Sequence, residues 1–389
     1  MISADSHVVE PAEVLAGLAE RFGDEAPRIV CHDDVPDVMY VPASRQKGLP
    51  PARLGIAGFR LDAASGLAVD PSVGVKPDPE DPDDPAVVAL CRGGYPALRA
   101  GIADPAARLA DQDVDGVRAE VLYPSAFFSV FGYRNADLVV AAFRNYNAWL
   151  AEYCSSAPDR LVGAALIPLH DPEAGLAELE KAVGRGARTA CIPCRAPAGR
   201  PYRDAAYEPI WRVAAEAGLP LALHIGTNGP GPGGGGPRRP SPDPIAVYAG
   251  ATSVIGDTLA ELIGQGVPAR HPELTFVVSE FNAGWLPNFL DRLDQGLQRN
   301  PTAASPDLDR LPSQYWRTNF KATIEDDRSA VLVRELLGTE TLLWGNDYPH
   351  RDSTWPRSRA VVDTVMAGVS EAERRLMVEG NAARLYRLA

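Results

Sequence analysis

Apolar positions from residue 100 onward fall into short uninterrupted runs, separated by longer segments in which apolar residues recur every three or four positions. Short apolar runs bounded by turn residues are typical of buried strands, and the longer period is typical of amphipathic helices. A further apolar run opens the chain at residues 2–4, so the pattern predicts eight strands. The seven later strands are expected at residues 119–124, 161–169, 189–193, 220–224, 274–280, 320–324 and 341–344.

Most of these strands are followed by a predicted helix, and this alternation indicates a parallel sheet covered by helices. Eight such units over about 300 residues fit a closed (β/α)8 barrel, the TIM-barrel architecture, better than an open doubly wound sheet. In such a barrel the chemistry lies at the carboxyl ends of the strands. The helices are expected at residues 104–114, 136–156, 172–183, 205–217, 244–263, 285–298 and 329–337, with two more after residue 350.

Residues 11–100 break this regular pattern. The stretch is rich in proline and glycine, and it includes an acidic, proline-interrupted run at residues 77–84. Proline removes helical hydrogen bonds, so that run is expected to be a solvated loop. The stretch is too long for an ordinary connection, and long loops are often lids. We therefore predict one domain, residues 1–389, with residues 11–100 as an inserted flap or small subdomain after the first strand.

Composition and charge narrow the possible functions. With 46% hydrophobic and 23% charged residues, the 389-residue chain is expected to be globular. A net charge of −13 argues against binding to nucleic acids or anionic membranes. Neither a signal peptide nor an apolar run of about 20 residues is visible, which predicts a cytoplasmic protein. The five cysteines form no even framework, so Cys191 and Cys194 are expected to be buried thiols.

Polar side chains collect where the predicted strands end. Asp5 and His7 lie two residues apart at the end of the first strand, so both side chains point to the same face. Carboxylates and imidazoles also follow several later strands, and buried charges must be paired or must bind a metal. Because such groups converge for ligation, the pattern predicts a divalent metal site. The candidate ligands are Asp5, His7, His170, His224, Glu280, Asp347 and His350.

Four motifs at these positions resemble the amidohydrolase superfamily. They are Asp-Ser-His-x-x-Glu-Pro, Leu-His, Glu-Phe-Asn-Ala-Gly-Trp-Leu-Pro and Asn-Asp-Tyr-Pro-His, at the first, fifth, sixth and eighth strands. The chain is most similar to the "amidohydrolase 2" branch, related to aminocarboxymuconate semialdehyde decarboxylase, over residues 1–10 and roughly 100–389. The resemblance implies that Asp5, His7, His224 and Asp347 form the family's first metal site. Asp5 stands where that family often has His or Glu.

The sequence departs from this family at the sixth strand. Hydrolytic and decarboxylating members typically carry a histidine there, as an acid–base group or second-metal ligand, whereas this chain has Glu280. With His350, the site would hold three carboxylates and three imidazoles, which suits two iron or manganese ions at least as well as one zinc. The combination resembles the non-haem di-iron monooxygenases on the same scaffold. We therefore expect two Fe ions and O₂-dependent hydroxylation of an unactivated carbon in a small or terpenoid-type acid.

Two alternatives stay open. A zinc- or manganese-dependent decarboxylase or hydrolase of a carboxylate substrate would use the metal to polarise the substrate or activate water, with Glu280 or His350 moving the proton. The other alternative is a non-catalytic metal-binding partner subunit. Glu280 could instead orient a ligand histidine, His350 could face the substrate, and His170 could only cap the turn that follows it. The family likeness also makes a homodimer an expected assembly.

Further residues near the strand ends are candidates for contacts with a small-molecule substrate. Arg238 and Arg239 end a glycine- and proline-rich loop that is expected to act as a mobile flap. Either arginine could bind a substrate carboxylate or phosphate, or be solvated. The aromatic residues that could line an apolar pocket, or belong to the core, are Tyr123, Phe127, Phe128, Trp285 and Tyr348. Outside the site, Glu10 is expected to anchor a loop, and His32 and His271 are expected to be solvated loop residues.

Overall fold

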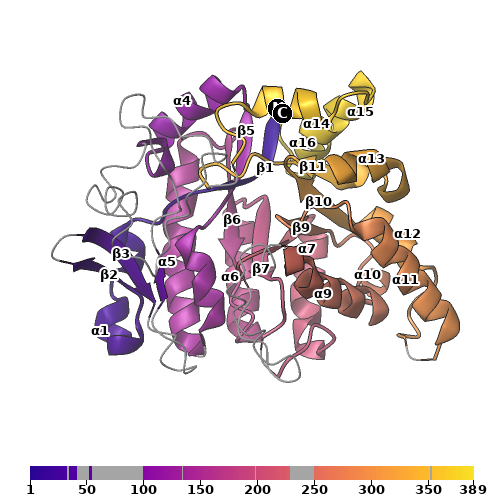
Figure 1. The fold of residues 1–389 in the computed structure, drawn as a ribbon. Helices are drawn as coiled ribbons and strands as arrows, with labels where there is room; N and C mark the ends of the chain where they lie inside the picture. Colours follow the sequence, from indigo (N-terminus) through magenta and orange to yellow (C-terminus); the bar gives the residue numbers. More distant parts are fainter. Residues whose placement is uncertain are drawn as a thin grey trace.

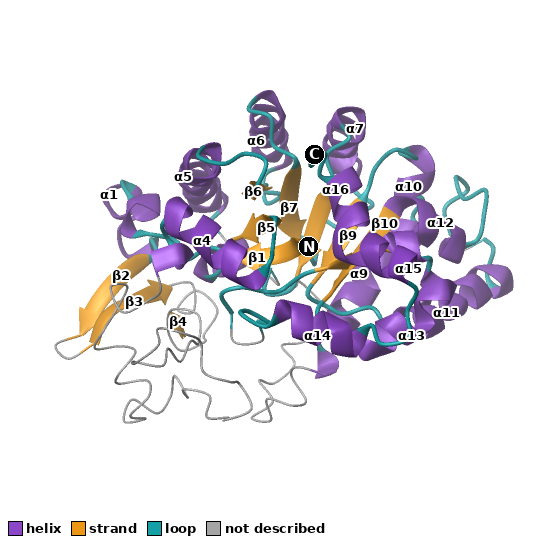
Figure 2. Cartoon of the chain, turned by 90° about the horizontal axis from the view of Figure 1, so that it is seen from above, coloured by secondary structure: helices purple, strands orange, loops and turns teal. Residues whose placement is uncertain are grey.

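The computed structural model describes residues 1–32, 35–41, 52–54, 100–133, 135–197, 199–227, 249–302, 304–350 and 353–389. Its centre is an eight-stranded sheet in which each neighbouring pair of strands runs parallel (Figure 1). Helices surround the strands when the molecule is seen from above (Figure 2). The predicted (β/α)8 barrel is confirmed. In order, the strands are β1 (Ile2–His7), β5 (Ala119–Tyr123), β6 (Leu161–Leu166), β7 (Thr189–Pro193), β8 (Leu221–His224), β9 (Phe276–Ser279), β10 (Phe320–Ile324) and β11 (Leu342–Trp344).

Backbone hydrogen bonds bring the first and last strands of the barrel together. The amide of Asp347, just beyond β11, donates to the carbonyl oxygen of Asp5 at 2.9 Å. The amide of His7 donates to the carbonyl oxygen of Tyr348 at 2.6 Å. Gly345 permits this approach, because a Cβ atom at this position would lie 2.6 Å from the Cβ of Asp5. The barrel therefore closes at residues that the sequence marks as candidate ligands.

The strands are buried on both faces, which explains why their sequences are apolar runs without alternation. Every residue of β5, β7, β8, β9 and β11 is buried. Outward side chains pack under the helices, and inward side chains fill the barrel. Polar residues are therefore exceptional here. The fully buried Asp5, His7 and His224 each need a partner in the interior.

The helices predicted from the apolar period all have counterparts among the described residues. After residue 350 there are three short helices where two were expected, and α1, α10 and α12 were not predicted. Aspartate side chains cap the amino ends of several of these helices. The carboxylate of Asp104 accepts a hydrogen bond from the amide of Ala107, and the carboxylate of Asp171 accepts one from the amide of Glu173. No helix in the described ranges is both long and apolar enough to cross a membrane. The helices are α4 (Pro105–Asp115), α5 (Ala136–Ser155), α6 (Pro172–Gly184), α7 (Glu208–Ala217), α9 (Thr252–Gly264), α10 (Val267–Arg270), α11 (Leu286–Arg299), α12 (Pro312–Asn319), α13 (Arg328–Leu337), α14 (Ser358–Val365), α15 (Glu371–Arg375) and α16 (Asn381–Leu385).

A second, smaller sheet follows β1 within the predicted insertion. After helix α1 (Leu18–Phe22), the strands β2 (Arg28–His32), β3 (Val35–Val41) and β4 (Ala52–Leu54) pair antiparallel, separately from the barrel. His32 ends β2, so its expected place in a loop was wrong. Residues 55–99 lie outside the described residues, and the flap over residues 11–100 stays a prediction.

Candidate metal centre

Strand β1 delivers two of the predicted ligands to the interior of the barrel. Ser3 pairs with Glu120 of β5, whereas Ser6 pairs with Leu122, so β1 carries one extra residue and bulges between them. Such bulges redirect side chains and are frequent beside active sites. Asp5 lies within this bulge. Its Oδ1 atom lies 3.7 Å from Nε2 of His7, and both side chains are fully buried.

The two buried histidines of the cluster present the same nitrogen to its centre. Nδ1 of His7 lies 2.7 Å from the carbonyl oxygen of Pro124, and Nδ1 of His224 lies 2.8 Å from the carbonyl oxygen of Ile225. A carbonyl oxygen only accepts hydrogen bonds, so Nδ1 carries the proton in each ring. The Nε2 lone pairs are then available to a metal, which is how ligand histidines are usually oriented.

Two carboxylates reach the cluster from strained backbone positions. Glu280 directly follows β9 with a φ of 63°, and Asp347 follows β11 with a φ of 51°. Residues other than glycine rarely adopt this left-handed conformation, and such strain concentrates at functional sites. The sharp turn after each strand aims its carboxylate at the centre of the barrel mouth.

The ligand atoms converge in two overlapping groups that share His7. Asp5, His7 and His224 form one group, and His7, Glu280, Asp347 and His350 form the other, with ligand atoms in each group within 4.8 Å of one another. Nε2 of His224 lies 3.0 Å from Oδ1 of Asp5. Nε2 of His7 lies 3.1 Å from Oδ1 of Asp347 and 3.9 Å from Oε2 of Glu280. Six of the seven predicted ligands therefore meet at one place.

Several of these buried atoms lack a hydrogen-bond partner among the described residues. Nε2 of His7 and both carboxylate oxygens of Asp347 are in this state. Imidazole nitrogens of His7 and His350 lie 3.1 and 3.0 Å from Oδ1 of Asp347. A buried polar atom without a partner is destabilising. Imidazole nitrogens and carboxylate oxygens are donors that divalent cations take, so the residues present fit a metal.

The protonation states also suit a metal. Burial and the neighbouring His350 lower the pKa of His7 to about 4, so its ring is neutral at pH 7. Burial alone would raise the pKa of Asp347, but His350 and His7 beside it bring that pKa below its ordinary value. A neutral imidazole and an ionised carboxylate are the ligand forms of these side chains.

Thr323, at the carboxyl end of β10, supports the cluster and was missed from the sequence. Its hydroxyl donates to Oδ2 of Asp5 at 2.8 Å and accepts from the amide of Glu280 at 2.8 Å. The side chain of Thr323 thus fixes the carboxylate of one candidate ligand, Asp5, and the strained backbone of another, Glu280. The only signal in the sequence was a threonine near the end of an apolar strand.

Aromatic rings enclose part of the cluster. The ring of Phe128 lies 4.4 Å from that of His224 and 5.9 Å from that of His7, measured between centroids. The ring of Tyr123 lies 4.6 Å from that of His224. Phe127 instead packs on Tyr146 in α5, at 5.6 Å. Tyr123 and Phe128 therefore form an apolar wall beside the two histidines.

Three predicted site residues make their contacts outside the two ligand groups. Tyr348 is buried, and its hydroxyl donates to Oδ2 of Asp111 in α4 at 2.7 Å, so it faces α4 and not the cluster. The indole N–H of Trp285 donates to the carbonyl oxygen of Phe281, and its ring packs on the side chain of Phe289 in α11. His170 places Nε2 2.9 Å from the carbonyl oxygen of Phe131, outside both ligand groups. Arg238 and Arg239 lie outside the described residues.

Glu10 and His271 were both predicted to lie outside the site, and only the role predicted for Glu10 agrees with the structure. Glu10 is confirmed as a loop anchor, because its Oε1 accepts from the amides of Ser125 and Phe127. His271 is not solvated, since its Nε2 lies 2.7 Å from Oε2 of Glu208.

The two cysteines expected as buried thiols are confirmed in that role. Cys191 and Cys194 are fully buried, and neither is in a disulfide bond. Burial raises the pKa of Cys194 to about 12. Both side chains are therefore protonated thiols at pH 7.

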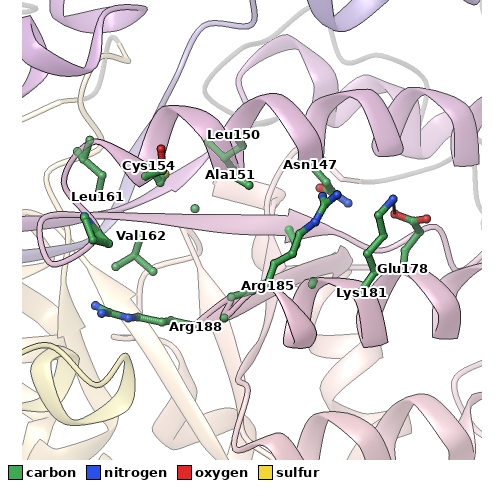
Figure 3. A pocket seen from close by; sticks show the side chains of 17 residues that line it. Asn147, Leu150, Ala151, Cys154, Leu161, Val162, Glu178, Lys181, Arg185 and Arg188 are labelled. Carbon is green, nitrogen blue, oxygen red and sulfur yellow. Dashed lines mark ion pairs between the residues drawn. The ribbon is translucent and has the colours of Figure 1, made fainter.

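A separate cavity lies outside the barrel wall, between α5 and α6 (Figure 3). Its volume is about 340 Å³, and its walls combine apolar side chains of α5 and β6 with Lys181, Arg185 and Arg188. Lys181 and Arg188 are paired with Glu178 and Asp159, respectively. None of the lining residues belongs to the ligand cluster, so this cavity is distinct from the candidate metal centre.

The fold and the cluster define an amidohydrolase-type metal enzyme, and comparison with known proteins agrees. The sequence profile of the amidohydrolase family matches residues 99–388. The chain therefore belongs to the amidohydrolase family, as its motifs predicted.

Among its relatives, the chain is 27% identical over 273 residues to the gamma-resorcylate decarboxylase of Rhizobium sp. strain MTP-10005, covering 63% of this chain and 76% of that one. Its fold is similar to that of an amidohydrolase from Mycobacterium avium subsp. paratuberculosis K-10, with a TM-score of 0.74, 20% identity and coverage of 99% and 97%. It is also similar to a dihydroxybenzoic acid decarboxylase from Polaromonas sp. JS666, solved with bound manganese, with a TM-score of 0.60, 23% identity and coverage of 75% and 89%.

Proposed function

We propose that this protein is a divalent-metal-dependent decarboxylase of a hydroxylated aromatic carboxylate. The observation that carries the proposal is that His7 joins Asp5 and His224 in one group of ligand atoms and Asp347 in the other. Nε2 of His7 and both oxygens of Asp347 are buried without a hydrogen-bond partner among the described residues. The relatedness to gamma-resorcylate decarboxylases supports the substrate class. It favours the decarboxylase alternative over the oxygenase expected from the motifs.

The four residues would hold the metal through Nε2 of the two histidines and one oxygen of each aspartate. A bound divalent cation supplies Lewis-acid polarisation of substrate oxygens. The chain's own contribution is orientation: the carbonyl oxygens of Pro124 and Ile225 fix the two imidazole rings through Nδ1–H. Phe128 beside the rings offers an apolar surface for an aromatic substrate.

Glu280 is the proposed proton donor. Its side chain is 23% exposed, whereas those of Asp5, His7, His224 and Asp347 are fully buried, so Glu280 is the most accessible of these five side chains to a substrate. In the proposed step, a proton from Oε2 adds to the ring carbon that bears the carboxylate. The C–C bond then breaks, its electron pair returns to the ring, and carbon dioxide leaves. One proton taken up from solvent restores the acid form of Glu280 after product release, so that each turnover consumes one proton and releases one carbon dioxide.

His350 is the alternative proton donor. Its side chain is 21% exposed, but Nδ1 lies 3.0 Å from Asp347 and Nε2 lies 3.0 Å from the hydroxyl of Ser125. The ring therefore contacts Asp347 on one side and hydrogen-bonds to Ser125 on the other, and it would have to turn to reach a substrate. This geometry favours Glu280 for proton transfer and His350 for holding Asp347.

The proposal is tested by supplying Mn²⁺-loaded protein with 2,6-dihydroxybenzoate and related hydroxybenzoates, and by following loss of substrate and release of carbon dioxide. We expect turnover that is abolished by a chelator and restored by Mn²⁺. Absence of turnover across the panel, with metal bound, would refute the decarboxylase assignment.

A dinuclear iron oxygenase is the second candidate, and Glu280 is the observation that favours it. The group formed by His7, Glu280, Asp347 and His350 could take a second cation beside the first. Hydroxylation would insert one oxygen atom of O₂ into a C–H bond and reduce the other to water, with two electrons from an external reductant and two protons from solvent. Two irons per chain and reductant-dependent O₂ consumption would favour this candidate, whereas one metal per chain and carbon dioxide release favour the decarboxylase.

A further inference from the structure

A buried arginine spans the place where the barrel closes. Arg108 lies in α4, and its side chain is fully buried. Its Nη1 donates to the carbonyl oxygen of His7 at 2.7 Å, and its Nη2 donates to the carbonyl oxygen of Tyr348 at 3.2 Å. One guanidinium therefore holds the backbone of the first strand and the backbone that follows the last strand.

The two carbonyl groups belong to the segments that carry the closest pair of ligands. His7 is itself a candidate ligand, and Tyr348 directly follows Asp347. The same Tyr348 carbonyl accepts from the amide of His7 at 2.6 Å. The side-chain approach of His7 Nε2 to Asp347 Oδ1, at 3.1 Å, thus depends on a backbone junction that Arg108 bridges.

The rest of the guanidinium is fixed as well. Its Nε donates to Oε2 of the buried Glu120 in β5 at 2.6 Å, and its Cζ lies 4.4 Å from the ring centroid of Tyr348. Gln112 donates to the same oxygen of Glu120 at 2.8 Å. Arg108 therefore has a single available orientation.

Burying such an ion pair is a poor way to gain stability, because the desolvation penalty can exceed the attraction between the charges. The planar guanidinium, in contrast, can address two carbonyl oxygens and a carboxylate at once, which the single ammonium of lysine does less well. The buried guanidinium of Arg108 is therefore suited to fixing the relative position of the two backbone segments that it contacts.

We propose that Arg108 is a positioning residue that sets the separation of His7 and Asp347 and thereby the metal affinity of the site. The inference rests on the metal centre of the proposed function, but not on the reaction assigned to it. Residues that orient ligands typically change metal affinity about 10–100-fold when they are replaced.

The test is the dissociation constant for Mn²⁺, measured by electron paramagnetic resonance titration of the full-length protein and of Arg108→Lys and Arg108→Met. We expect weakening of about 10–100-fold in Arg108→Met, partial recovery in Arg108→Lys, and an altered Mn²⁺ spectrum in both. The matched control is Asn319→Ala. Asn319 is also buried and donates to the carbonyl oxygens of Leu274 and Pro272, but at the amino end of the barrel.

The outcomes separate a positioning role from a merely structural one. If Asn319→Ala lowers the melting temperature as much as Arg108→Lys but leaves Mn²⁺ affinity and spectrum unchanged, the inference is supported. If both variants weaken Mn²⁺ equally, or Arg108→Lys binds Mn²⁺ as the wild type does, it is overturned. Should the Arg108 variants not fold, Glu120→Gln, which removes the charge opposite Nε, is expected to weaken Mn²⁺ in the same direction, and unchanged affinity there overturns the inference.

Failure of the proposed function gives a different result. Wild-type protein that binds Mn²⁺ but decarboxylates nothing refutes the reaction and leaves the Arg108 comparison intact. Wild-type protein that binds no divalent metal overturns both.

Discussion

Two buried side chains at the amino end of the barrel and two candidate ligands at its carboxyl end differ in their hydrogen bonding. At the amino end, Asn319 donates to the carbonyl oxygen of Leu274, and the hydroxyl of Thr189 donates to the carbonyl oxygen of Pro220. At the carboxyl end, Nε2 of His7 and both oxygens of Asp347 have no hydrogen-bond partner among the described residues. Asn319 and Thr189 therefore complete the fold, whereas the unpartnered atoms of His7 and Asp347 are of the kinds that a bound cation takes.

The difference also shows in the backbone. Glu280 and Asp347, both at the carboxyl end, have positive φ values. Strain and unpartnered buried atoms are each destabilising, and they persist where the surrounding structure imposes them. Their coincidence at one rim indicates that stability is lower there in the metal-free protein, and a bound cation would restore it.

The largest effect is expected for His7→Ala, because His7 belongs to both groups of ligand atoms. We expect Mn²⁺ affinity to fall by more than the roughly 10–100-fold typical of residues outside the ligand shell. Metal content after dialysis, measured by mass spectrometry, checks this. The control is His271→Ala, which removes an imidazole paired with Glu208 far from the cluster. Equal metal content in the two variants would contradict the assignment.

The second prediction is a loss of decarboxylase activity when Glu280 is replaced. We expect Glu280→Gln to lower kcat for decarboxylation by about 10²–10⁴-fold, the usual contribution of a positioned acid–base group, while one Mn²⁺ per chain is retained. Glu280→His introduces the side chain that the family resemblance expects at this strand, and we expect it to recover part of the activity. Loss of one of two bound metals in Glu280→Gln would instead favour the dinuclear candidate.

A smaller effect is expected for Thr323→Val. The substitution keeps a β-branched side chain but removes the hydroxyl that holds Asp5 and the amide of Glu280. We expect Mn²⁺ affinity to fall about 10-fold, at the low end for such supporting residues. Thr189→Val removes a buried hydroxyl at the amino end and serves as the control, with unchanged affinity. A similar loss of affinity in both variants would show that general destabilisation is responsible.

The smallest effect on the metal is expected for Asn319→Ala. Its amide nitrogen satisfies carbonyl groups at the amino end, so its loss should lower the free energy of unfolding by about 1–3 kcal/mol. Mn²⁺ affinity should not change. Chemical denaturation with and without Mn²⁺ measures both quantities, and a variant with normal stability would contradict the structural role.

Most of the barrel could be predicted because its strands are buried on both faces. The predicted bounds of β7 and β10 match the structure, since short, mostly apolar segments bounded by turn residues are typical of buried strands. Helix α12 was missed because it is short and largely polar, and the antiparallel sheet β2–β4 was missed because its strands lack a regular period. The formation of such short elements depends on contacts with residues that are distant in the sequence, and a local pattern does not reveal these contacts.

The candidate ligands could be predicted from the sequence, but the residues that support them could not. Asp5, His7, His224 and Asp347 could be recognised because carboxylates and imidazoles are rare at the ends of apolar strands. Thr323 and Arg108 could not, because a threonine in a strand or an arginine in a helix is common, and their roles arise from residues more than 100 positions away. The contact of Tyr348 with Asp111 could not be predicted either, because the direction of a side chain beyond a strand end depends on the partner that it finds in the fold.

The central claim is that Asp5, His7, His224 and Asp347 bind one divalent cation together. Anomalous diffraction from crystals grown with Mn²⁺, collected on both sides of the manganese absorption edge, tests it directly. The account predicts a manganese peak within about 2.0–2.3 Å of Nε2 of His7 and His224 and of one oxygen of each aspartate. Crystals with manganese bound elsewhere, or with no anomalous peak at this cluster, would contradict it.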